Sequence, residues 1–167
     1  MAKITLRVDG RARTVEAAAD EPLLYVLTGE LGLKGPRFGC GLAQCGSCSV
    51  LADGVEIRAC AIPATQLQGK AITTLEGLPG WHSARGGRLE GGLHPVQQAM
   101  IDEQAAQCGY CFNGMIIKAA ELLARTPRPS EPEIRAAMNG HICRCGTYPR
   151  IIRAISRAAS AMAGEPA

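Results

Sequence analysis

The sequence predicts an α+β protein in which a β-rich half precedes a helical half. Short alternating runs of apolar and polar residues, separated by Asp-Gly pairs, occupy residues 1–76. Residues 93–163 instead carry apolar residues at the spacing of helices. Eight cysteines divide equally between the halves, which favours two small domains, each with its own site.

Two β-hairpins are expected in the first half. The Asp-Gly pairs at 9–10 and 53–54 each lie between two runs with the period-2 alternation of strands. Asp-Gly is a preferred sequence for a two-residue hairpin turn. The four runs are residues 3–8, 11–16, 49–52 and 55–59.

A helix and a last strand complete this half. Residues 23–31 carry a stripe of Leu and Val, and Asp20 is the expected N-cap of that helix. Residues 71–74 form a short final strand. Two hairpins, one helix and a closing strand predict a ferredoxin-like β-grasp domain over residues 1–76.

Residues 77–92 are expected to be a linker. They contain six glycines and show little apolar periodicity. Trp81 lies within this stretch, and we expect it to contact a partner rather than a core.

Four helices are expected to form a bundle over residues 93–163. Two of them occupy residues 94–106 and 112–125. The third follows Ser130, which forms a capping-box pattern with Glu133. The fourth is opened by Thr147 and Pro149.

The first four cysteines have the spacing of one kind of metal site. Cys40, Cys45, Cys48 and Cys60 read C-x4-C-x2-C-x11-C, which is typical of a plant-type [2Fe–2S] cluster. Glycines in the surrounding loop allow tight turns and let backbone N–H groups point at the sulfurs. Zinc is a weaker alternative, because three ligands on one loop suit it poorly.

The second four cysteines are expected at helix ends. Cys108, Cys111, Cys143 and Cys145 read C-x2-C-x31-C-x-C. Cys111 and Cys145 come just before helices, whose positive ends would stabilise an anionic cluster. The spacing alone leaves zinc open. His141 is expected to be structural or exposed to solvent, with a supporting role beside Cys143 as the alternative.

Composition excludes several classes of protein. The net charge is only +3 and the basic residues are scattered, so no nucleic-acid partner is expected. No apolar run approaches the roughly 20 residues that span a bilayer, and the N-terminal residues do not resemble an export signal. We expect a cytoplasmic protein with no transmembrane segment, whose reduced thiols bind metal rather than form disulfides.

The cysteine motifs resemble those of one enzyme family. The runs at residues 40–48 (CGLAQCGSC), 107–111 (QCGYC) and 143–147 (CRCGT) are similar to the small iron–sulfur subunit of the molybdenum hydroxylases, which include xanthine oxidase and aldehyde oxidoreductase. The resemblance extends over about residues 3–160.

A subgroup of this family is the more similar one. Residues 94–115 resemble the small subunits of two-subunit nicotinate dehydrogenases and isoquinoline 1-oxidoreductases. Many other members have Thr-Pro where this chain has Phe112-Asn113, and Thr-Gly where it has Gly146-Thr147. The departure supports the subgroup and leaves the cysteines unchanged.

The resemblance implies an electron-transfer subunit of an oxidoreductase complex, with two [2Fe–2S] clusters and no catalytic residue on this chain. A large partner subunit would hold molybdopterin, in its cytosine dinucleotide form, and hydroxylate the substrate. Gln107 and Cys145 match family residues that contact the pterin. Electrons would pass from the pterin to the helical-domain cluster, then to the ferredoxin-domain cluster and an external acceptor, such as a cytochrome or a flavin subunit.

Two points stay open at this stage. The resemblance favours an N-heteroaromatic substrate, nicotinate- or isoquinoline-like, over an aldehyde. A free-standing two-cluster ferredoxin or redox sensor is the alternative function; such a carrier would be monodisperse alone, whereas a subunit would expose an apolar patch.

Overall fold

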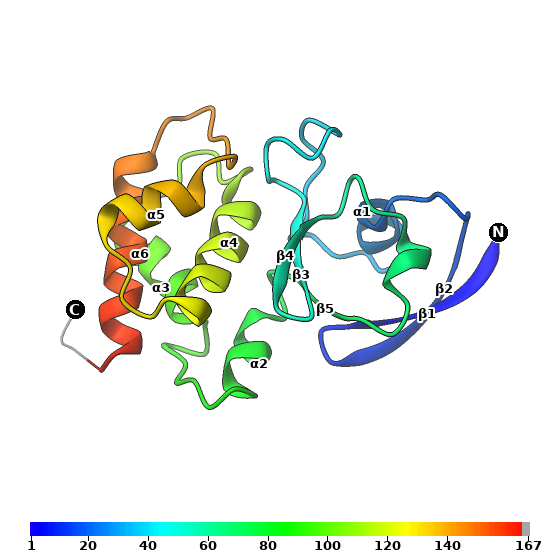
Figure 1. The fold of residues 1–167 in the computed structure, drawn as a ribbon, viewed down its shortest axis with the longest axis horizontal. Helices are drawn as coiled ribbons and strands as arrows, with labels where there is room; N and C mark the ends of the chain where they lie inside the picture. Colours follow the sequence, from blue (N-terminus) through cyan, green and yellow to red (C-terminus); the bar gives the residue numbers. More distant parts are fainter. Residues whose placement is uncertain (165–167) are drawn as a thin grey trace.

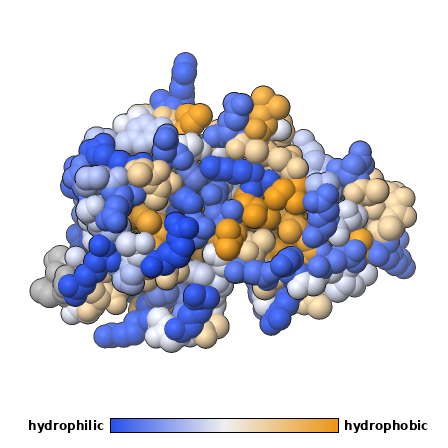
Figure 2. All heavy atoms as spheres, viewed as in Figure 1, coloured by the Kyte–Doolittle hydropathy of each residue, from blue (hydrophilic) through white to orange (hydrophobic). Residues whose placement is uncertain are grey.

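The computed structural model describes residues 1–164 and confirms the α+β prediction. A sheet with its short helices and a group of longer helices lie side by side along the long axis of the molecule (Figure 1). Each part has its own cluster of buried apolar side chains. On the face shown in Figure 2, apolar side chains gather over the sheet half, next to the helices.

The sheet has five strands in the order β2-β1-β5-β3-β4. Both hairpins form as predicted, and β5 lies between them, parallel to β1 and antiparallel to β3. Asp9 and Asp53 adopt positive φ angles of 51° and 50°, as the first position of a tight hairpin turn requires. The strands are β1 (Ala2–Val8), β2 (Arg11–Ala17), β3 (Ser49–Ala52), β4 (Val55–Arg58) and β5 (Ala71–Thr73).

The helix of the β-grasp half is present, but its predicted cap is wrong. A short α1 (Leu23–Tyr25) continues into a π-helical turn, η1 (Val26–Glu30). The N-cap is Pro22, with no side-chain hydrogen bond, because Asp20 lies too far before the helix to reach its first N–H groups. A 3₁₀ turn, η2 (Ala64–Leu67), is an addition to the predicted elements.

Four helices form the second half, as predicted. Helix α4 is the most buried and packs against the other three, as well as against β3 and β4. The capping box of α5 forms, since the Ser130 backbone N–H donates to the Glu133 carboxylate at 2.7 Å. The helices are α3 (Pro95–Asp102), α4 (Phe112–Arg125), α5 (Glu131–Met138) and α6 (Tyr148–Met162).

The segment predicted as a linker begins with a helix, which corrects that interpretation. Helix α2 (Leu78–Ser83) buries Leu78 and His82. Trp81 packs on the helical core and stacks on His94 at 6.3 Å, so it already has contacts within the chain. In the sequence, the many glycines of this stretch obscure the short apolar face of the helix. Residues 84–92 are irregular, and the division of the chain into domains stays a prediction.

Within residues 1–164, none of the helices has the length and apolar character needed to cross a bilayer.

Candidate metal centres

Three cysteines of the first quartet lie on the loop before β3, and the fourth, Cys60, follows β4. The Cys40 Sγ accepts hydrogen bonds from the backbone N–H groups of Leu42, Gln44 and Cys45, each at 3.3 Å. The Cys40 N–H in turn donates to the Cys45 Sγ at 3.3 Å. The loop therefore points backbone donors at sulfur, as expected from its glycines.

The thiols of this loop differ in their readiness to ionise. Burial opposes ionisation of Cys40, but the backbone N–H donors outweigh it and lower the pKa of this thiol to about 7. Cys48 lies in the core, where burial raises the pKa of its thiol to about 12. Since a metal ion binds the thiolate, it would displace the proton from such buried thiols.

A small residue is required beside the sulfurs. A Cβ at Gly39 would lie 2.7 Å from the Cys45 Sγ, closer than any side chain allows. The loop thus leaves space where a side chain would otherwise meet sulfur, and the fit to a thiolate-bound cluster is good.

The second quartet lies where two helices begin. Cys111 is the N-cap of α4, and Cys145 lies two residues before Thr147, the N-cap of α6. Burial raises the pKa of the Cys111 thiol to about 12. Burial also disfavours the Cys143 thiolate, but the backbone N–H of Thr147 and further hydrogen bonds lower its pKa to about 7.

The thiols approach one another in pairs. The Sγ atoms of Cys108 and Cys145 are 3.5 Å apart. Side-chain hydrogen bonds also join the other thiols two by two. Within the described residues, no three His, Cys, Asp or Glu side chains converge as a single-ion site would need. The pairs are Cys40 with Cys45, Cys48 with Cys60, Cys108 with Cys145, and Cys111 with Cys143.

The second quartet has an outer and an inner side. Cys108 is exposed and Cys145 is half-buried, whereas Cys111 and Cys143 are buried. Gln107 is exposed beside the outer pair. It lines a cavity of about 290 Å³ whose other walls are Gly146, Thr147, Pro149, Arg150 and Arg153.

The inner side of the second quartet meets the first quartet. The backbone N–H of Ile142, next to Cys143, donates to the Cys45 carbonyl at 2.9 Å. The Asn113 side chain, two residues after Cys111, donates to the carbonyls of Ser47 and Ser49 at 2.8 and 2.9 Å. Backbone segments beside the ligand candidates of both quartets are thus in direct contact.

Sequence reasoning missed most of this contact. In the sequence, Asn113 stands out only as a departure from a family motif, and His141, expected to be structural or exposed, is 3% exposed at the boundary between the halves. A glycine inside a predicted helix was a usable signal. A Cβ at Gly114 would collide with the Gly46 carbonyl oxygen, so close packing requires glycine there.

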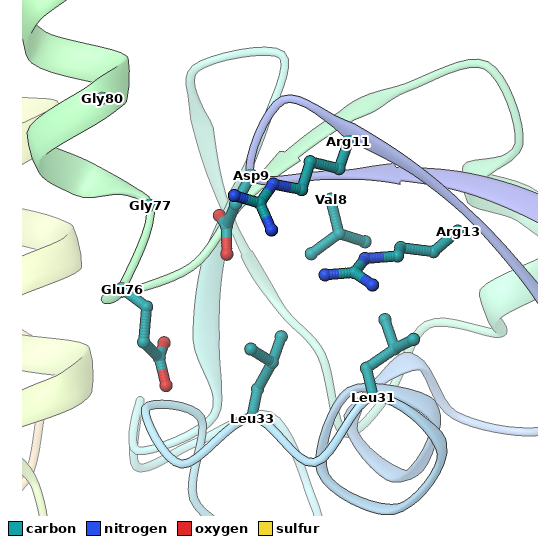
Figure 3. Close-up of a pocket in the computed structure, with 9 residues that line it drawn as sticks. All are labelled: Val8, Asp9, Arg11, Arg13, Leu31, Leu33, Glu76, Gly77 and Gly80. Atoms are coloured by element: carbon teal, nitrogen blue, oxygen red, sulfur yellow. The ribbon is translucent and has the colours of Figure 1, made fainter.

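A separate cavity of about 350 Å³ lies beyond the C-terminal end of β5, and no cysteine of either quartet lines it (Figure 3). Asp9 and Glu76 both bind the Thr74 hydroxyl, at 2.7 and 2.8 Å. Glu76 also accepts the backbone N–H groups of Lys34 and Gly35 at 2.9 and 2.7 Å. These hydrogen bonds hold Lys34 and Gly35, which lead into the loop of the first quartet.

The chain matches two family models. Residues 6–73 match the 2Fe-2S iron-sulfur cluster binding domain, and residues 74–156 match the [2Fe-2S] binding domain.

Two relatives are similar over most of the chain. One subunit of the nicotinate dehydrogenase of Pseudomonas putida is 51% identical over 156 residues, which covers 93% of this chain and 94% of that protein. The alpha chain of isoquinoline 1-oxidoreductase of Brevundimonas diminuta is 46% identical over 147 residues, covering 88% and 90%.

Solved structures share the fold. A chain of quinoline 2-oxidoreductase from Pseudomonas putida superposes with a TM-score of 0.84 at 34% identity, covering 99% of this chain and 98% of that one. Aldehyde oxidoreductase from Desulfovibrio desulfuricans gives a TM-score of 0.88 at 36% identity; the match covers 99% of this chain and 18% of that one.

Proposed function

Because this chain belongs to the small [2Fe–2S] subunits of the molybdenum hydroxylases and is an electron-transfer subunit of an oxidoreductase complex, we propose that electrons enter it at the second quartet and leave it at the first. The family resemblance found in the sequence is confirmed, and with it the binding of two [2Fe–2S] clusters. The observation that carries the proposed direction is the two-sided arrangement of the second quartet.

All eight cysteines are the proposed cluster ligands. Each close pair of thiols would bind one iron, so that each quartet holds two irons. A bound cluster supplies a centre that takes up and releases one electron. Pairs fit two irons better than one zinc ion, which needs all four thiolates around a single point.

The outer side of the second quartet is the proposed contact with the large molybdopterin-binding subunit. Gln107 is exposed there, and its amide offers both donors and an acceptor to the polar edge of a pterin. The exposed Cys108 and the half-buried Cys145 lie at the same edge. Cys145, as in the resembled family, is the ligand expected to approach the pterin.

The inner side leads to the first quartet. The hydrogen bond from Ile142 to the Cys45 carbonyl is a short route between the loops of the two quartets. Beyond it, the loop of the first quartet reaches the surface, where Leu42 is 69% exposed. An external acceptor can approach this loop, and we propose a cytochrome or a flavin subunit for that role.

The proposed substrate is an N-heteroaromatic compound, nicotinate- or isoquinoline-like. Support comes from the relatives, whose names specify nicotinate and isoquinoline. An aldehyde is the less favoured class, and the pterin is proposed in its cytosine dinucleotide form. Assaying the purified complex with nicotinate, isoquinoline and an aromatic aldehyde, and extracting its nucleotide, tests these assignments.

We also propose assembly in the cytoplasm, where reducing conditions keep the thiols available for iron. Fractionation of cells that carry the complex, followed by detection of this chain, checks it.

The direction of transfer is tested by Cys48→Ser in the assembled complex. Substrate should still reduce molybdenum, whereas turnover with the natural acceptor should stop. Gln107→Ala should leave both clusters assembled, and should slow electron transfer out of molybdenum or weaken binding of the large subunit. Full turnover of Cys48→Ser with the natural acceptor would show that the proposed order is wrong.

A further inference from the structure

A group of charged and polar side chains is buried where the sheet meets the helices, and we name it the junction network. Its members come from β4, from α4 and from the segment between α5 and α6. Two acidic and two basic side chains are present, together with one histidine. The members are Glu56, Arg58, Lys118, Glu121 and His141.

Glu56 is the centre of this network. Its carboxylate lies 2.9 Å from Arg58, 3.4 Å from the Nε2 of His141 and 3.7 Å from Lys118. The Ser49 hydroxyl is a fourth partner at 2.5 Å. Burial favours the neutral acid, but these partners outweigh it and hold the pKa of Glu56 at about 2, so the group is an anion.

Arg58 extends the network across the junction. Its guanidinium lies 2.9 Å from the His141 Nε2 and donates to the Gly140 carbonyl at 3.2 Å. The Nδ1 of the His141 ring has no hydrogen-bond partner among the described residues.

The partners of Glu56 are neighbours of the cluster ligands. Ser49 directly follows Cys48, Arg58 lies two residues before Cys60, and His141 lies two residues before Cys143. The network therefore contacts chain segments of both quartets at once.

Stability alone is a poor explanation for this arrangement. Buried charges lose hydration, and apolar side chains of similar volume often stabilise a protein as well or better. The halves are already joined by the Asn113 and Ile142 hydrogen bonds. Because Glu56 contacts Arg58 on its own strand and Lys118 across the junction, the geometry of the junction is the property that the network here would protect.

We propose that Glu56 is a positioning residue for electron transfer between the two clusters, holding Arg58 and His141 between the two ligand-bearing segments and so fixing the separation of the quartets. With both clusters bound, one electron would pass from the reduced centre held by the second quartet to the oxidised centre held by the first, with no bond made or broken. The proposal rests on the ligand assignment given under Proposed function.

The test uses the full chain with both clusters assembled, and the variant Glu56→Gln. This change keeps the size and polarity of the side chain but removes its charge, leaving Arg58 and Lys118 without their shared anion. The magnetic interaction between the two reduced clusters depends on their separation and orientation, and is read from the splitting of their electron paramagnetic resonance signals. We expect a changed or lost splitting, with both signals present.

Electron transfer between the clusters should slow several-fold in the same variant. The rate of electron transfer falls as the two centres move apart, so a displacement of the ligand-bearing segments is expected to slow it. Glu56→Asp, which keeps the charge, should recover part of the splitting and of the rate.

The matched control is Glu131→Gln. Glu131 also binds an arginine, Arg135, at 2.6 Å, but on the exposed side of α5. This control should retain the native splitting and rate. If Glu56→Gln lowers the melting temperature while splitting and rate stay native, the role is only stabilising and the proposal is overturned.

A second variant covers failure of Glu56→Gln to fold or to bind its clusters. Lys118→Gln removes one partner of Glu56 and should change the splitting in the same direction, by less. Native splitting in this variant would then overturn the proposal. Iron content and the presence of both signals test the ligand assignment separately.

Discussion

The two quartets reach the same chemistry by different routes. In the first, three thiols lie on the loop of residues 40–48, and backbone N–H groups of that loop surround the sulfurs. In the second, 31 residues separate Cys111 from Cys143. Its two halves meet only because α4 and α6 pack in one core.

Each quartet nevertheless combines a thiol that ionises readily with one that does not. Cys40 and Cys143 have a pKa of about 7, whereas burial raises the pKa of Cys48 and Cys111 to about 12. The comparison teaches that local loop geometry and long-range helix packing can create equivalent sites. The two sites should therefore be destroyed by different substitutions.

The largest expected effect is loss of one cluster. Cys111→Ser should remove the two irons, two acid-labile sulfides and the paramagnetic signal of the second quartet, because a [2Fe–2S] cluster needs four ligands. The first signal should remain. Stoichiometric zinc without labile sulfide in the native protein would contradict the assignment, and Cys60→Ser is the reciprocal control.

A core substitution should separate the two sites by stability. Leu123→Ala, at a position in α4 that is 1% exposed, should cost about 2–5 kcal/mol of unfolding free energy. On heating, the signal of the second quartet should disappear well before that of the first. Leu6→Ala in the core of the sheet is the matched control and should reverse the order. Simultaneous loss in both variants would mean that the halves unfold as one unit.

The variant Gly114→Ala tests the contact between the two quartets. The added methyl group would collide with the Gly46 carbonyl, at a cost of about 1–3 kcal/mol. Both clusters should form, but their magnetic interaction should change. Gly80→Ala in α2, where no atom lies within 4 Å of the new methyl group, should leave it unchanged. An unaltered magnetic interaction in Gly114→Ala would show that the segments at Gly114 and Gly46 can move apart without changing the arrangement of the two clusters.

The smallest effect is expected from cleavage of the chain between α2 and α3. Limited proteolysis should cut first within residues 84–92, which are irregular and mostly exposed, and spare 78–83, which α2 protects. The paramagnetic signals should survive the cut. First cleavage within α2, detected by mass spectrometry, would show that this helix is not stably docked.

Local signals in the sequence predicted most of the fold. The Asp-Gly turns and the Ser130 capping box act over four residues, so the sequence displays them directly. Helix α2 could not be predicted in this way, because a helix of six residues in a glycine-rich stretch is too short to show helical periodicity. The cap of α3 escapes it too: His94 accepts the Val96 N–H at 3.1 Å, an uncommon use of histidine.

The two cysteine sites could be predicted from the sequence, whereas the contact between them could not. The spacing of the cysteines indicated both quartets, since ligand spacing is a local property of the chain. The contact between them was not predictable, because Glu56 and His141 are distant in sequence and neither belongs to a cysteine motif. Only packing of the two halves brings such residues together.

Helix α2 has a consequence for how this architecture can be divided or recombined. Leu78 belongs to the helical core, and Trp81 lies on that core while its ring also approaches the turn at Gly54. A helical unit that begins at residue 93 would leave an apolar surface uncovered. A unit that begins near residue 74 would keep its cover, so the module that can be transferred between proteins is expected to start at the last strand of the sheet.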